Sequence, residues 1–168
     1  MNVVIDIETL SLQPNAIILS IGAVADSGET FYTELDWEAQ LMAARHVDAR
    51  TAIWWGKQIE QVPLLGEVFL EYCLLDLNQW LADYDKDKLY IWARGPQFDI
   101  VILENAYQEV CMEVPWKYRN VRDVRTALHL STVTDLFKPT RKHHALDDAI
   151  ADMKNLALRG FTTYDFRT

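Results

Sequence analysis

The sequence predicts a mixed α/β domain in which helices flank a single β-sheet, and two observations lead to this prediction. Three strand-like segments stand at the start of the chain, and helical patterns then alternate with a further strand. Strands that alternate with helices after an initial meander are typical of a mixed sheet covered by helices. No internal repeat, low-complexity tract or linker divides the 168 residues, so we expect a single domain over 1–168.

The first three strands are expected at 2–7 (NVVIDI), 16–25 (AIILSIGAVA) and 30–35 (TFYTEL). The first is short and β-branched, the second is apolar enough to be central, and the third alternates between apolar and polar residues. The segment DSGE at 26–29 is typical of a hairpin turn between the second and third strands.

The rest of the chain is dominated by helical patterns. A helix is expected at 49–60 and a long, strongly periodic one at 66–84, followed by a strand at 88–93. The pair Gly95-Pro96 then interrupts the chain before another helix begins. The remaining helices are expected at about 97–110, 122–130 and 145–159, with a short strand left open between the first and last of them.

The composition is that of an ordinary soluble globular protein, since 50% of the residues are hydrophobic and 24% are charged. No apolar run is long enough for a bilayer, and the first ten residues lack the basic flank of a signal peptide, so we expect a cytoplasmic protein without a membrane partner. Cys73 and Cys111 lie in apolar, helix-like contexts and are expected to be buried free thiols.

The formal net charge of −9 argues against loose binding along a nucleic-acid duplex, which normally requires a basic patch. A nucleic-acid partner stays compatible with this charge if the acids are clustered and neutralised by metal ions. The local concentration of positive charge is KPTRKHH at 138–144, which is either a loop that phosphate approaches or solvated charge.

Asp6 and Glu8 stand two residues apart on the first expected strand, so both carboxylates should lie on one face of the sheet. On a central strand they would repel each other and lose hydration unless a cation lay between them. The alternative is an edge strand with one face in water.

Two further sites carry acids. Asp99 stands at a helix start, where the helix dipole alone would explain it. The segment KHHALDD at 142–148 contains two histidines and two aspartates, and helical periodicity does not distinguish Asp147 from Asp148. Together these sites supply carboxylates and an imidazole, a set that suits Mg²⁺ or Mn²⁺ better than zinc. Carboxylates that hold two such ions about 4 Å apart recur in phosphodiester hydrolysis.

The segments DIET (6–9), FD (98–99) and HHALDDA (143–149) resemble the three motifs of the DEDDh, or DnaQ-like, 3′→5′ exonucleases. The third motif of that family, His-x-Ala-x-x-Asp-Ala, is satisfied here by His143 and Asp148. The ordered combination is a much stronger signal than any one motif. Longer segments resemble prophage exonuclease VIII-type and mycobacterial exoribonuclease-like proteins, namely 14–24, 51–55, 98–107 and 115–126.

The resemblance implies a ribonuclease-H-like fold, in agreement with the order of strands and helices. It implies that two divalent ions, Mg²⁺ or Mn²⁺, are held by four carboxylates, and that His143 is the general base for the attacking water. The four carboxylates are those of Asp6, Glu8, Asp99 and Asp148. The implied reaction releases nucleoside 5′-monophosphates from the 3′ ends of single-stranded DNA or RNA, or from overhangs.

Several residues near the motifs have further expected roles. Thr9, Leu10 and Phe98 are the expected substrate-binding residues, with the backbone at Thr9 contacting the terminal sugar and Leu10 packing under the terminal base. Arg94 either contacts substrate phosphate or pairs with a surface acid, and we favour the surface pair. Asp123 either orients an active-site loop or forms a surface salt bridge.

Trp54 and Trp55 are adjacent, so on a helix they cannot share one face. Core or interface packing is favoured for both over stacking on a base. Alternatives to a DNA exonuclease stay open: an exoribonuclease, an endonuclease on the same fold, and a catalytically inactive oligonucleotide-binding module. The resemblance also suggests a homodimer.

Overall fold

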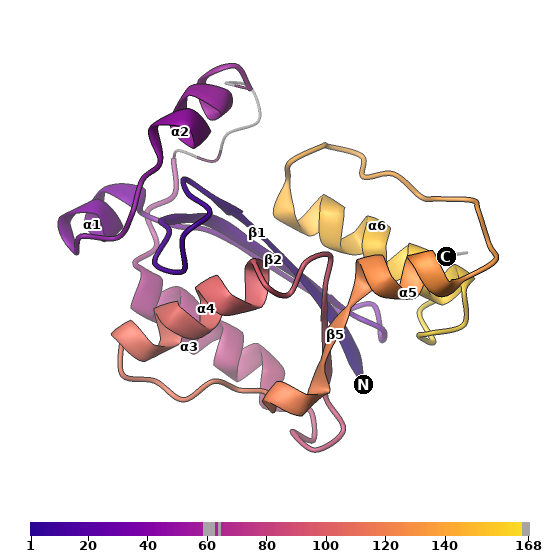
Figure 1. Cartoon of the computed structure of the whole chain (residues 1–168). Coiled ribbons are helices and arrows are strands. Elements are labelled where there is room, and N and C mark those ends of the chain that lie inside the picture. The colour runs from indigo at the N-terminus through magenta and orange to yellow at the C-terminus, as the bar shows by residue number, and fades with distance from the viewer. Residues whose placement is uncertain (59–62, 64, 166–168) are drawn as a thin grey trace.

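A computed structural model describes residues 1–58, 63 and 65–165 and has a five-stranded mixed sheet at its centre, in the order β3-β2-β1-β4-β5 (Figure 1). The first three strands form an antiparallel meander, and β4 and β5 extend the sheet in parallel with β1. The predicted fold class is therefore confirmed. The strands are β1 (Asn2–Thr9), β2 (Ile18–Ala25), β3 (Thr30–Glu34), β4 (Tyr90–Ala93) and β5 (Val121–Asp123).

Helices cover both faces of the sheet (Figure 1). Helices α3 (Leu70–Leu81) and α4 (Asp99–Glu109) pack on one face, and α5 (Val124–Leu130) and α6 (Ala145–Leu158) pack on the other. Two short helices, α1 (Trp37–Met42) and α2 (Ala49–Gly56), precede α3, and a 3-10 helix (Tyr118–Asn120) leads into β5.

Most predicted elements are confirmed, and the differences have local causes. The helix expected at 66–84 begins at Leu70, because Val68 is still extended and bridges Leu35 beside the sheet. Helix α1 was not predicted; Asp36 caps its first turn by accepting a hydrogen bond from the Ala39 amide. Residues 59 and 60 of the helix expected at 49–60 lie outside the described residues.

Strand β1 divides its side chains between the two cores. Val3, Ile5 and Ile7 pack with α3 and α4, whereas Val4 packs with α6. Since side chains alternate along a strand, Asp6 and Glu8 face α6 together with Val4. Because β1 lies between β2 and β4, the edge-strand alternative for its two acids is wrong.

Gly22 allows α6 to approach the sheet closely. It pairs with Asp6 in the β1–β2 register, and a Cβ atom added there would lie 2.2 Å from the backbone nitrogen of Leu146. That distance is too short for any side chain, so only glycine lets the start of α6 rest on β2. The first turn of α6 is thereby brought next to β1.

The prediction for the two cysteines is confirmed for one of them only. Cys73 is buried as expected, but Cys111 is exposed, because it follows α4 in a turn with φ of 56°. Among the described residues, no helix combines the length and the hydropathy that crossing a membrane requires.

Candidate active site

Three carboxylates from opposite ends of the chain meet on the α6 face of the sheet. Asp6 and Glu8 of β1 and Asp148 in the first turn of α6 each offer one oxygen, and these atoms all lie within 4.8 Å of one another. Such a spacing allows one cation to contact all three groups. The structure therefore selects Asp148, which periodicity did not distinguish from Asp147.

Asp99 lies beside this trio. It is the first residue of α4, its exposed fraction is 4%, and it lines the same cavity as Asp6, Glu8 and Asp148. The cavity has a volume of about 570 Å³, and His143 also lines it. All five residues expected at the catalytic centre are thus brought to one place.

The pKa values of these acids are raised. Burial, followed by repulsion from Asp99, Glu8 and Asp148, raises the pKa of Asp6 well above its usual range. The same two causes raise the pKa of Glu8 to about 8. Burial raises the pKa of Asp99 to about 7, although a hydrogen bond from the Ile7 amide acts in the opposite direction. A divalent cation would offset both the repulsion and the lost hydration, so the donor set fits hard metal ions.

His143 stands on the loop before α6 with a left-handed backbone, φ 61°. Its ring meets the ring of Trp54 edge-on, with centroids 4.7 Å apart, and lies 6.2 Å from the ring of Trp55. Burial and the nearby Lys142 lower the pKa of His143, while Asp148 opposes them. The neutral imidazole, which can accept a proton, is therefore the favoured form near neutral pH.

The neighbouring histidine and aspartate have structural contacts instead. The ring of His144 stacks on Tyr32 at 4.4 Å, and its Nδ1 accepts a hydrogen bond from the Asp147 amide at the start of α6. Asp147 forms an ion pair with Arg141, with 3.0 Å between Oδ2 and Nε. These contacts hold the loop on either side of His143.

Arg94 pairs with an acid, as favoured, but this acid is buried and not on the surface as predicted. Its Nε donates to Oδ2 of Asp152 at 3.0 Å, and its Nη2 contacts the other carboxylate oxygen. Asp152 has an exposed fraction of 3% and lies one turn after Asp148 on α6. Sequence reasoning missed Asp152; its spacing of one turn from Asp148 was the available signal.

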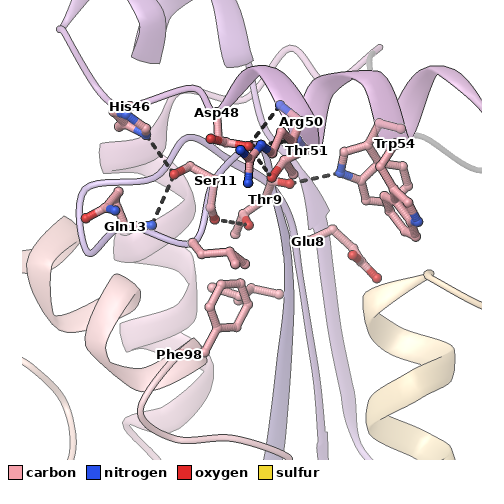
Figure 2. A pocket seen from close by; sticks show the side chains of 13 residues that line it. Glu8, Thr9, Ser11, Gln13, His46, Asp48, Arg50, Thr51, Trp54 and Phe98 are labelled. Carbon is pink, nitrogen blue, oxygen red and sulfur yellow. Dashed lines mark hydrogen bonds between the residues drawn. The ribbon is translucent and has the colours of Figure 1, made fainter.

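A second cavity of about 510 Å³ adjoins the first and shares Ile7, Glu8, Leu12 and Phe98 with it. Thr9, which is predicted to bind substrate, also lines it. Figure 2 shows Glu8, Thr9 and Phe98 around this space, with His46 and Trp54 at opposite ends.

Leu10 does not line either cavity, contrary to its predicted place under the substrate base. It is 7% exposed and packs in a small core with Ile17, Leu19 and Trp55, because its side chain points into the protein. Leu12, two residues later, is 76% exposed and lines both cavities.

The polar wall of the second cavity comes from the loop after β1 and from the segment leading into α2. The Oγ of Ser11 lies 2.7 Å from Nδ1 of His46 and accepts a hydrogen bond from the Gln13 amide (Figure 2). Asp48 caps α2 by accepting hydrogen bonds from the amides of Arg50 and Thr51. The wall therefore combines groups able to contact a sugar or a base edge.

The two tryptophans of α2 have different environments. Trp55 is 3% exposed, and its Nε1 donates to the Thr9 carbonyl at 2.8 Å, so the core prediction is confirmed for this residue. Trp54 is 38% exposed and lines the second cavity, so it is not a core residue. Asp123, the other undecided residue, caps α5 by accepting a hydrogen bond from the Arg125 amide.

Comparison with known proteins places the chain among nucleases. The family model described as the 3′-5′ exoribonuclease Rv2179c-like domain matches residues 1–158. A search of curated proteins gave no match.

Similar solved structures share the ribonuclease-H-like fold at low sequence identity. Cell-death related nuclease 4 (CRN-4) has a TM-score of 0.62 and 15% identity over 96% of this chain, which spans 64% of that protein. The nuclease domain of 3′hExo, a DEDDh family member bound to rAMP, has a TM-score of 0.56 and 14% identity, covering 98% of this chain and 94% of that one. A full-length 3′-exonuclease has a TM-score of 0.53 and 14% identity, covering 97% and 83%.

Proposed function

The chain belongs to the family of Rv2179c-like 3′-5′ exoribonuclease domains and is a 3′-5′ exonuclease of the DEDDh type, and from this premise we propose its substrate and its catalytic residues. The proposed substrate is the 3′ end of single-stranded nucleic acid, with RNA preferred to DNA. The proposed products are nucleoside 5′-monophosphates. The family description supports RNA, and the two adjoining cavities support a terminal nucleotide beside an acidic centre.

The trio of Asp6, Glu8 and Asp148 is the observation on which the proposal rests. With Asp99, these residues would hold two divalent ions, Mg²⁺ or Mn²⁺. When bound, the ions supply the positive charge that activates a water molecule and stabilises the departing oxygen. Their charge would also allow a protein with a net charge of −9 to attract a polyanion at this site.

His143 would accept the proton of the attacking water at an imidazole nitrogen. Its lowered pKa keeps the ring ready to accept a proton at neutral pH, and it lines the cavity that contains all four acids. Arg94, held by Asp152, and Arg125 contribute positive charge to the wall of that cavity.

The second cavity would receive the terminal nucleotide. Leu12 and Phe98 provide apolar surface for the base, and Thr9 and Glu8 stand where the sugar would enter the acidic centre. Leu12 replaces Leu10 in this assignment, since Leu10 belongs to the core. A stacked base and a fixed sugar would place the last phosphodiester next to the carboxylates.

The test is a time course on 5′-labelled single-stranded RNA and on DNA of the same sequence, with Mg²⁺, with Mn²⁺ and with chelator. We expect metal-dependent shortening from the 3′ end, faster on RNA, and nearly abolished in His143→Ala. A circular RNA should stay intact, because an exonuclease needs an end. Binding without shortening under every metal condition would contradict the proposal and indicate an inactive binding module.

A further inference from the structure

Trp54 lies between the two cavities. Its side chain lines the cavity assigned to the terminal nucleotide, and its ring meets that of His143 edge-on. His143 lines the first cavity, which contains the four acids (the acidic cavity), and does not line the second, which is assigned to the terminal nucleotide (the nucleotide cavity). We propose that Trp54 is a positioning residue that couples filling of the nucleotide cavity to the placement of His143. This inference rests on the proposed function of both cavities.

The ring of His143 depends on these aromatic contacts. Within residues 1–58, 63 and 65–165, its imidazole makes no hydrogen bond and no ion pair, and its ring contacts are those with Trp54 and Trp55. Asp148 acts on the imidazole through its charge, which does not fix the orientation of the ring. A base without a hydrogen-bonded partner to orient it can adopt several side-chain rotamers. The edge-on indole therefore supplies the orientation that a carboxylate or a carbonyl supplies to many catalytic histidines.

The backbone around His143 is fixed by other residues. Arg141, before His143, and Asp147, after it, form an ion pair across the loop, and His144 stacks on Tyr32 of β3. These contacts hold the loop while leaving the ring of His143 to be placed by α2.

Trp54 itself is anchored on one side and accessible on the other. Its ring packs edge-on against Trp55, with centroids 4.9 Å apart, and Trp55 is tied to the Thr9 carbonyl next to Glu8. The exposed fraction of Trp54 is 38%, so a base or sugar in the cavity can contact it. Such a contact would reduce the rotamers open to Trp54 and so fix the surface that His143 meets.

The first test needs no metal and no turnover. Adenosine, which has a base and a sugar but no phosphate, is titrated into the protein in the presence of chelator while the ring C–H signals of histidine and phenylalanine are followed by NMR. His143→Ala identifies the His143 signal, and Phe98→Leu identifies the signal that reports cavity filling. We expect adenosine to shift both signals in the wild type.

In Trp54→Ala, adenosine should still shift the Phe98 signal while the His143 shift is lost, and Trp54→Phe should restore part of it. An unchanged His143 shift in Trp54→Ala would overturn the inference. So would a wild-type protein in which adenosine shifts Phe98 and leaves His143 unmoved.

The second test is kinetic and uses the metal-loaded protein on single-stranded RNA. Trp54→Ala should lower kcat by at least about 10-fold with a smaller change in KM, and Trp54→Phe should recover most of kcat. Trp80→Phe is the matched control and should keep wild-type kcat. Trp80 packs on Phe31 in the core beneath α3 and α4, away from both cavities. An active wild type with an equally active Trp54→Ala would overturn the inference alone, whereas an inactive wild type would overturn the proposed function.

Discussion

Arg94 and Asp152 form a two-point ion pair one helical turn from Asp148, at the edge of the acidic cavity. Burial raises the pKa of Asp152, and the Arg94 guanidinium opposes that rise. A fifth carboxylate would otherwise add its negative charge to four acids that already repel one another. The pair therefore limits the negative charge at the edge of the acidic cavity.

Removing the Arg94 side chain should destabilise the protein, because Asp152 would then be buried without its partner. We expect Arg94→Ala to lower the free energy of unfolding by about 1–3 kcal/mol at pH 7, less than for a fully buried pair because Arg94 is partly exposed. Urea denaturation measures the change. The double variant Arg94→Ala/Asp152→Asn should regain most of the loss, and a double variant as unstable as the single one would contradict the explanation.

Replacing Glu8 by glutamine should stabilise the metal-free protein. Burial and repulsion raise the pKa of Glu8 from 4.5 to about 8, so the folded state holds this proton more tightly than the unfolded state does. The contribution of Glu8 to stability therefore falls as pH rises from about 4.5 to about 8 and is then constant. Glutamine does not ionise, so Glu8→Gln does not lose stability in this pH range. Its free energy of unfolding should exceed that of the wild type only slightly at pH 4 and by about 2–4 kcal/mol at pH 9.

Thermal unfolding in chelator across this pH range measures the Glu8 effect. With saturating Mg²⁺ or Mn²⁺ the order should reverse, because glutamine is a poorer ligand and the wild type gains the binding free energy of the ion. Equal stability of the two proteins at pH 9 in chelator would show that Glu8 is not destabilised by its surroundings.

Alanine substitutions at Leu12 and Leu10 should have different effects, the first on substrate binding and the second on stability. Leu12→Ala should raise KM for RNA several-fold and leave the melting temperature within about 1–2 °C of wild type, since the side chain is 76% exposed. Leu10→Ala should lower the free energy of unfolding by about 2–4 kcal/mol, since it opens a hole beside Ile17, Leu19 and Trp55. Steady-state kinetics and urea denaturation distinguish the two outcomes, and a reversed pattern would restore Leu10 as the residue under the base.

Gly22→Ala should damage the site without touching a ligand. Its Cβ would lie 2.2 Å from the Leu146 nitrogen, so the start of α6 must move away from β2 and take Asp148 with it. We expect a loss of about 1–3 kcal/mol in stability and weaker metal binding, measured by calorimetry. Gly56→Ala, where an added Cβ meets nothing within 4 Å, is the control. Unaltered metal affinity in a folded Gly22→Ala protein would contradict this role.

The sequence predicted the fold from local patterns, and it predicted the acidic centre from local patterns together with the motif resemblance. Alternation on β1 placed Asp6 and Glu8 on one face, and the motif resemblance selected His143 and Asp148. Long-range packing decided the remaining features. Nothing local distinguishes Leu10 from Leu12, since the bend after β1 determines which of them turns inward.

The partner of Arg94 and the place of Trp54 could not be predicted for the same reason. Arg94 is separated from Asp152 by 58 positions, and Trp54 meets His143 only because α2 and the loop before α6 lie over the same end of β1. The role of Gly22 could not be predicted either, because it depends on how closely a helix more than 100 positions later approaches β2.

The separation of the acids along the chain also affects the order in which the enzyme becomes competent during synthesis. Asp6 and Glu8 are synthesised first, and their partner Asp148 follows every other described strand and helix. Until then no nascent chain can assemble the trio, even if the first hairpin has already formed. The carboxylate trio, on which the proposed function rests, is therefore complete only once α6 has docked on the sheet.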